Sequence, residues 1–269
     1  MPNNKLLNTL KQALKPARFP VMFKKLLRRF FDTPGRHTRK ENLDWLESNC
    51  SNFMQLATSL DADLWHEAEI VSRSVELHAA KILENIEYKL GGGGAYPFLY
   101  FLTRYMEPDC IVETGVAAGF SSYAFLLALK ANQRGTLHSS DFPYFRIPDP
   151  EKYVGVIIEE KIRKGWNLYL DGDEVNLPKI ANAVDQVDIF HYDSDKSYAG
   201  RAFALSTISS SLSDRGVIIM DDIQDNSFFY DTVEESNPGS WYVFRFQDKF
   251  LGLIGQPTRR CFKNRTTDK

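Results

Sequence analysis

A glycine turn at residues 115–119 constrains this sequence most, because it joins a predicted buried strand to a predicted helix. Residues 110–114 form a short apolar run that includes the acid Glu113, a pattern typical of a buried strand. Gly115 and Gly119 follow, and the pattern then becomes helical over residues 120–129. Glycine lets a ligand lie against bare backbone, and a helix start presents free N–H groups. The sequence therefore predicts an α/β fold with a ligand at this turn.

The spacing of these glycines argues against a nicotinamide dinucleotide. The dinucleotide fingerprint G-x-G-x-x-G requires a glycine where Ala117 stands, and the turn reads G-x-x-x-G instead. With Glu113 the turn reads E-x-G-x-x-x-G, which resembles the S-adenosylmethionine turn of class I methyltransferases; a turn without a ligand is the alternative. By this resemblance the cofactor-binding residues include Glu113, Gly115, Gly119, Ser121 and Ser122.

The distribution of charge divides the chain. Of 269 residues, 43% are hydrophobic and 25% charged, which suits a globular domain with a sizeable core. The net charge is only −2, yet residues 1–40 hold six Lys and five Arg against one Asp and carry about +10. We therefore predict a basic amphipathic extension over residues 1–40, a helical region over 41–94 and the S-adenosylmethionine-binding domain over 95–269.

Cysteine usage and hydropathy bear on the location of the protein. Cys50, Cys110 and Cys261 match neither disulfide nor zinc spacing, so we expect a reducing compartment and a cytoplasmic protein. No apolar run reaches the roughly 18 to 20 residues of a membrane span. Residues 1–31 mix basic and apolar residues at helical spacing. This segment is either a peripheral membrane contact or an extension that packs on a partner, for which a homo-oligomer is one option, and a mitochondrial presequence also fits its composition. No nucleic-acid partner is expected.

The remaining pattern alternates predicted strands with helices. Strands are expected over residues 136–141, 166–170, 187–192 and 217–220, a helix over 151–164, and a hairpin over 241–246 and 250–254. This order predicts a Rossmann-like, doubly wound, mostly parallel seven-stranded sheet with an antiparallel C-terminal hairpin.

Two further acids are expected to contact the cofactor. Asp141 ends the second strand, 28 residues after Glu113, where an acid accepts the hydroxyl groups of a ribose; a turn or helix cap is the alternative. Gly172 and Asp173 follow the third strand, at the place where methyltransferases commonly carry a Gly-Asp pair beside adenine. The resemblance therefore extends the cofactor site to Gly172 and Asp173.

Carboxylates follow two later strands. Asp193 follows strand 187–192, and Asp221 and Asp222 follow strand 217–220. If these strands are neighbours, about 4.8 Å apart, their carboxyl ends bring the three carboxylates together. Carboxylates in one crevice repel one another unless a cation compensates them, and Mg²⁺ prefers oxygen ligands of this kind. The pattern favours a divalent-cation site, with a loop-capping role for the Asp pair as the alternative.

The same segments carry a second resemblance, over about residues 95–255. Residues 193–200, Asp-Ser-Asp-Lys-Ser-Tyr-Ala-Gly, and residues 216–222, Gly-Val-Ile-Ile-Met-Asp-Asp, resemble the metal-dependent O-methyltransferases of the catechol and caffeoyl-coenzyme-A group. They are also similar to sugar O-methyltransferases and their cephalosporin-tailoring relatives. The resemblance implies that Asp193, Asp221 and Asp222 bind the metal and that Lys196 is the general base.

The sequence departs from these families at two positions. The catechol group usually has Asn at the position of Asp222, and the sugar-modifying relatives often have His at the position of Lys196. His191 and Asp193 are therefore alternatives to Lys196 as the catalytic base.

These resemblances imply an S-adenosylmethionine-dependent O-methyltransferase assisted by Mg²⁺ or a similar divalent cation. Its expected acceptor is a hydroxyl group of a sugar, a glycosylated metabolite or a catechol-like compound, because vicinal oxygens would fill two open metal positions. One alternative is a metal-independent small-molecule methyltransferase. Another is a non-catalytic nucleoside-binding module that docks through its basic N-terminal segment.

Overall fold

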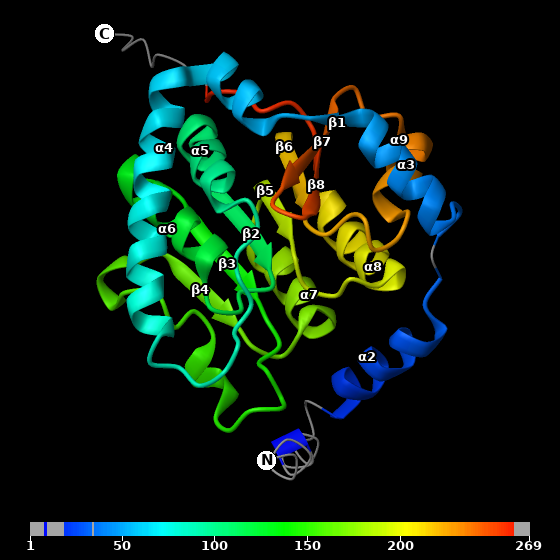
Figure 1. Ribbon diagram of the computed structural model, residues 1–269, viewed down its shortest axis with the longest axis horizontal. Coiled ribbons are helices and arrows are strands. Elements are labelled where there is room, and N and C mark those ends of the chain that lie inside the picture. The colour runs from blue at the N-terminus through cyan, green and yellow to red at the C-terminus, as the bar shows by residue number, and fades with distance from the viewer. Residues whose placement is uncertain (1–7, 10–18, 34, 261–269) are drawn as a thin grey trace, which may run out of the picture.

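An eight-stranded sheet organises the computed structural model, which describes residues 8–9, 19–33 and 35–260 (Figure 1). The strand order is β1-β7-β8-β6-β5-β2-β3-β4. β8 pairs antiparallel with β6 and β7, and the other pairs are parallel. The strands are β1 (Cys50–Ser51), β2 (Cys110–Thr114), β3 (Thr136–Ser140), β4 (Trp166–Tyr169), β5 (Val187–Tyr192), β6 (Leu212–Met220), β7 (Trp241–Phe246) and β8 (Lys249–Ile254).

This topology confirms the predicted Rossmann-like sheet with its C-terminal hairpin, and adds one strand. The two-residue β1 pairs with β7 and brings the number of strands from the predicted seven to eight. The strand order reverses between the neighbours β2 and β5, and ligands of open α/β sheets bind beyond the carboxyl ends of strands at such a point. The fold therefore places a candidate site beyond β2 and β5.

Helices cover both faces of the sheet (Figure 1). Ile111 of β2 packs in the core with α4, α5 and α6, whereas its neighbour Val112 packs in the core on the other face. Side chains alternate along a strand, and β5 is buried at every position because each of its faces is covered. The helices are α2 (Phe19–Phe31), α3 (Arg39–Asn49), α4 (Phe53–Leu83), α5 (Tyr96–Met106), α6 (Phe120–Asn132), α7 (Asp173–Ala183), α8 (Tyr198–Ile208) and α9 (Phe228–Ser236).

One predicted helix is wrong. Residues 151–164 contain only two short 3₁₀ helices, Pro150–Tyr153 and Glu160–Ile162. Between them Gly155 has φ +65°, a left-handed backbone conformation, and a Cβ there would lie 2.4 Å from the Trp166 ring. A positive φ interrupts an α-helix, and the ring of Trp166 occupies the space that a side chain would need.

The basic N-terminal segment is described only in part. Helix α2 confirms the helical pattern over residues 19–31, whereas most of the leucine-containing pattern of residues 5–15 lies outside the described residues, as does Cys261. None of the described helices is long and apolar enough to cross a membrane.

Candidate functional site

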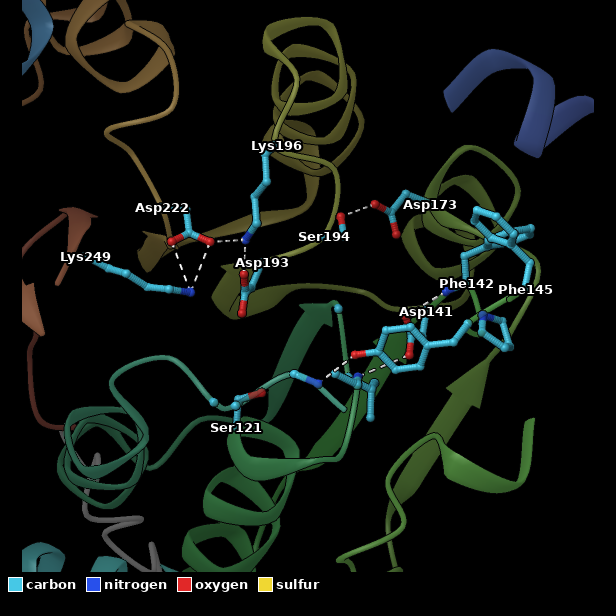
Figure 2. A pocket seen from close by; sticks show the side chains of 18 residues that line it. Ser121, Asp141, Phe142, Phe145, Asp173, Asp193, Ser194, Lys196, Asp222 and Lys249 are labelled. Carbon is cyan, nitrogen blue, oxygen red and sulfur yellow. Dashed lines mark hydrogen bonds and ion pairs between the residues drawn. The ribbon is translucent and has the colours of Figure 1, made fainter. Parts of the chain in front are cut away.

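A cavity of about 390 Å³ lies beyond the carboxyl ends of β2, β3 and β5. Its size is in the range of small-molecule sites, and its position is the one expected for a ligand in this fold. One end is lined by the loop 141–145, and the other by charged residues that follow β5 and β6 or begin β8 (Figure 2). The segments 91–93 and 115–117 also line the cavity.

Glycine is required at position 115 because the turn passes directly against the end of β5. Gly115 has φ +82°, and a Cβ there would lie 2.1 Å from the carbonyl oxygen of Asp193. Gly119 has φ +106° and begins α6, whose second residue, Ser121, lines the cavity. The predicted arrangement of strand, turn and helix is therefore confirmed, and the turn joins the two ends of the cavity.

Two residues predicted at the cofactor lie behind the turn. Glu113 is fully buried, and its Oε2 accepts hydrogen bonds from the hydroxyls of Ser122 at 2.5 Å and Ser139 at 2.8 Å. Neither Glu113 nor Ser122 lines the cavity. Both side chains instead tie β2 to α6 and β3, and so hold the turn in position.

Asp141 and Asp173 do line the cavity, next to the aromatic rings of Phe142 and Phe145 (Figure 2). The carboxylate of Asp141 accepts hydrogen bonds from the backbone N–H of Ala117 at 3.2 Å and of Phe142 at 2.7 Å. Asp173 accepts from Ser140 Oγ at 2.7 Å and from the hydroxyl of Ser194. Both acids are thereby fixed at one end of the cavity.

Gly172 lies just outside the cavity lining. Its φ is +86°, and its N–H donates to the carbonyl oxygen of Asp141 at 3.1 Å. It therefore joins the end of β3 to the start of α7.

The other end of the cavity holds two acids and two lysines. Lys196 Nζ lies 2.7 Å from Asp222 Oδ2 and also donates to Asp193, whereas Lys249 Nζ lies 3.1 Å from Asp222 Oδ1. Asp222 is thus paired with two ammonium groups, which come from different parts of the chain (Figure 2). The predicted convergence of carboxylates on β5 and β6 is real, but lysines already compensate their charge.

These contacts set the protonation states of the cluster. Burial would raise the pKa of Asp222, but the ammonium groups of Lys196 and Lys249 outweigh it and hold this pKa at about 2. Burial would lower the pKa of Lys196, but the carboxylates of Asp193 and Asp222 outweigh it and raise this pKa. Lys196 is therefore a cation at neutral pH and has no free lone pair with which to accept a proton.

Asp221 does not line the cavity. Its carboxylate is buried and lies against Gly94, where a Cβ would be 2.4 Å from Oδ2, and this oxygen has no hydrogen-bond partner among the described residues. Burial, followed by the charges of Asp193 and Asp222, raises the pKa of Asp221 to about 6.

His191 lies deeper still. The side chain is fully buried in β5, where its ring packs edge-on against Phe125 of α6, and Nδ1 is 3.8 Å from Glu113 Oε1. It does not line the cavity, so it has no direct path to a bound acceptor.

The side chains present here do not fit the predicted divalent-cation site. Carboxylate oxygens are suitable ligands for Mg²⁺. However, Asp193 and Asp222 are already paired with ammonium groups, and Asp221 is directed at Gly94. Among the described residues, no group of three or more His, Cys, Asp or Glu side chains is arranged to hold a metal ion. A cation would have to displace Lys196 and Lys249 first.

The region around the cavity also matches a family of known proteins. Residues 112–223, which run from β2 to just beyond Asp222, match a family model described as a methyltransferase domain. The match covers 112 of the 269 residues, and over this segment the chain is similar to that domain. No curated protein matches this sequence significantly.

Solved structures extend this likeness to the fold. A methyltransferase from Geobacter sulfurreducens has a TM-score of 0.51 at 17% identity, over 68% of this chain and 90% of that one. The O-methyltransferase TomG from Streptomyces achromogenes is involved in tomaymycin synthesis and was solved with S-adenosylmethionine. It has a TM-score of 0.52 at 14% identity, over 68% of this chain and 89% of that one. An O-methyltransferase from Bacillus cereus, solved with S-adenosylhomocysteine, has a TM-score of 0.51 at 14% identity, over 78% of this chain and 100% of that one.

Two residues at the charged end of the cavity were not expected from the sequence. Lys249 begins β8, far along the chain from Asp222, and only the pairing of β8 with β6 brings it to the cavity. Arg201 of α8 is 1% exposed and donates to the carbonyl oxygens of Asp221 at 3.0 Å and Asp222 at 2.9 Å. The only sequence signal for Arg201 was its position in the first turns of α8, four residues after the N-cap Ser197.

Proposed function

We propose that this protein is an S-adenosylmethionine-dependent O-methyltransferase that binds cofactor and acceptor in the cavity described above. One observation carries the proposal: a single cavity is lined both by the glycine turn with Asp141 and Asp173, and by Asp193 with Lys196. The first set suits a nucleoside, because an acid at the position of Asp141 accepts ribose hydroxyls. The second set suits proton transfer beside a sulfonium group.

The cofactor's orientation follows from the two ends of the cavity. Phe142 and Phe145 lie at the Asp141 end, where they offer apolar surface to an adenine ring. The positively charged sulfonium is then directed toward Asp193, whose carboxylate favours a nearby positive charge. The transferable methyl group would lie at the charged end.

The reaction needs a base, and we propose that Asp193 takes this role. A lone pair of the acceptor oxygen forms the new bond to the methyl carbon while the carbon–sulfur bond breaks and leaves its electron pair on sulfur. The acceptor's proton passes to the carboxylate of Asp193, because Lys196 is already protonated. The ammonium group of Lys196 stabilises negative charge that develops on the acceptor oxygen.

We propose further that this reaction does not require a divalent cation. Lys196 and Lys249 supply positive charge at the place where the resemblance to the catechol group implied Mg²⁺. The acceptor remains a hydroxyl group of a sugar, a glycosylated metabolite or a catechol-like compound, since all three present a hydroxyl oxygen to the charged end.

A methyl-transfer screen over sugars and catechols, run with and without EDTA, tests both parts. We expect transfer to at least one hydroxyl acceptor at a rate that EDTA leaves unchanged. Loss of turnover with EDTA and recovery with Mg²⁺ would restore the metal-dependent mechanism. Calorimetry with S-adenosylmethionine and with NAD tests the cofactor separately, and binding of NAD alone would refute the methyltransferase proposal.

The hydroxyl of Tyr144 provides a smaller prediction about the cofactor's end of the cavity. It accepts a hydrogen bond from the N–H of Gly91 at 2.8 Å, and both residues line the cavity. One hydrogen bond contributes about 0.5–1.5 kcal/mol, so Tyr144→Phe should weaken S-adenosylmethionine binding by about 2- to 10-fold in calorimetry. Tyr242→Phe removes a hydroxyl that bonds Gln256 away from the cavity and should bind as the wild type does. Equal affinity in all three proteins would contradict a role for this contact.

A further inference from the structure

Helix α2 is attached to the α/β domain through its basic side. Val21 is buried, and its Cγ1 would lie 3.0 Å from a Cβ at Gly172. Lys24 Nζ lies 2.7 Å from Glu174 Oε2. Arg28 contacts both Glu174 Oε1 at 2.5 Å and Asp195 Oδ2 at 2.9 Å. These side chains, three and four positions apart, define the face of α2 that contacts the domain.

The opposite face of α2 carries exposed phenylalanines. Phe19 and Phe23 are 56% and 49% exposed, and their rings stack with centroids 6.1 Å apart. Each lies two residues from Val21, which at about 100° per residue places them on the side away from the domain. Phe31, at the end of the helix, is 82% exposed. Three of the seven exposed large hydrophobic residues in the described part of the chain therefore belong to this one helix.

We propose that α2 is an interfacial helix that inserts Phe19 and Phe23 into an anionic membrane surface. Lys24 and Arg28 pair with the domain, but α2 contains two further basic residues and no acid, and residues 1–40 carry about +10 in total, a charge that is complementary to such a surface. Helices that lie in the membrane interface combine an apolar face with basic residues in this way. A second copy of the chain is a poorer occupant, since it would bring another strongly basic segment against the first.

The attachment of α2 places the membrane beside the cavity. Glu174 follows Asp173, and Asp195 stands between Ser194 and Lys196, so each partner of Arg28 is next to a residue that lines the cavity. A docked α2 would hold this side of the cavity roughly one helix diameter, about 10 Å, from the lipid surface. This inference concerns binding and does not depend on the proposed reaction.

Flotation of the full-length protein with liposomes tests the proposal. We expect binding to vesicles of phosphatidylcholine and phosphatidylserine, and weaker binding to pure phosphatidylcholine vesicles or at high salt. The double variant Phe19→Ser/Phe23→Ser should bind at least about tenfold more weakly, because it lacks the two aromatic side chains that insert into the lipid surface. The matched control Ile70→Ser/Leu77→Ser, which removes exposed apolar side chains from α4, should bind as the wild type does.

Three results would overturn the proposal. The first is equal liposome binding by the wild type and the Phe19/Phe23 variant, and the second is no binding by the wild type. The third is a dimer in light scattering that becomes a monomer in this variant, which would identify a second copy of the chain as the occupant of the face. Thermal unfolding and S-adenosylmethionine affinity, measured on each variant, distinguish these results from misfolding and from failure of the proposed function.

Discussion

Replacement of Asp193 by Asn should lower kcat/KM for methyl transfer by about 10²- to 10⁴-fold, the usual contribution of a general base. Asparagine keeps the size of the side chain but cannot take the proton of the acceptor hydroxyl. S-Adenosylmethionine affinity should change little, because Asp141 and Asp173 at the other end of the cavity are untouched. The measurement is steady-state methyl transfer together with cofactor calorimetry.

A matched control separates the role of Asp193 from a general effect of charge. Asp171→Asn makes the same change at an acid that pairs with Lys179 at 3.2 Å, outside the cavity lining. This variant should retain wild-type kinetics. Asp193→Asn with full activity would remove Asp193 from the mechanism.

Variants of Lys196 decide between the two roles considered for this residue. If its ammonium group acts electrostatically, Lys196→Arg keeps the positive charge and should retain more activity than Lys196→Met. If Lys196 were the base, arginine would be as inactive as methionine, since a guanidinium group does not lose its proton at neutral pH. Equal inactivity of both variants would therefore favour Lys196 as the base over Asp193.

The sequence predicted where the acids gather, because this depends on strand order alone. Tyr192 pairs with Met220 in the sheet, so Asp193 and Asp221 leave adjacent strands at the same edge. Their orientation could not be predicted in the same way, because β6 ends at Met220 and Asp222 has φ +53°, so the chain is no longer extended there. Asp222 lines the cavity, whereas the carboxylate of Asp221 lies against Gly94.

The partners of these acids could not be predicted from local pattern. Lys249 reaches Asp222 only because β8 inserts between β6 and β7, a pairing fixed by contacts far apart in sequence. The same limit applies to His191, whose place in a buried strand predicts burial but not which helix covers it. The acids would have the same positions in the sequence whether lysines or a metal ion compensated their charge. Only the tertiary contacts distinguish these two cases.

Removal of the Arg201 guanidinium should produce the largest loss of stability among these variants. Arg201 is buried and donates to the carbonyl oxygens of Asp221 and Asp222, and its guanidinium carbon lies 5.7 Å from the centre of the Tyr192 ring. Methionine fills a similar space but leaves both buried carbonyls without these donors. Hydrogen bonds to charged groups contribute about 1.5–3 kcal/mol each, and the avoided burial of a cation offsets part of this loss. We expect Arg201→Met to lower the free energy of unfolding by about 3 kcal/mol in urea titrations.

The same substitution should also lower catalysis in the molecules that remain folded. Asp222 has φ +53°, a left-handed conformation that is uncommon outside glycine and that the bonds from Arg201 help to hold. Without them Asp222 is free to relax and to release Lys196 and Lys249, so kcat should fall while cofactor affinity persists. Arg245→Met, which removes an arginine paired with Glu47 at the surface, should change the free energy of unfolding by less than about 0.5 kcal/mol. If Arg201→Met unfolds at the same urea concentration as this control, the buried guanidinium does not stabilise the acidic loop.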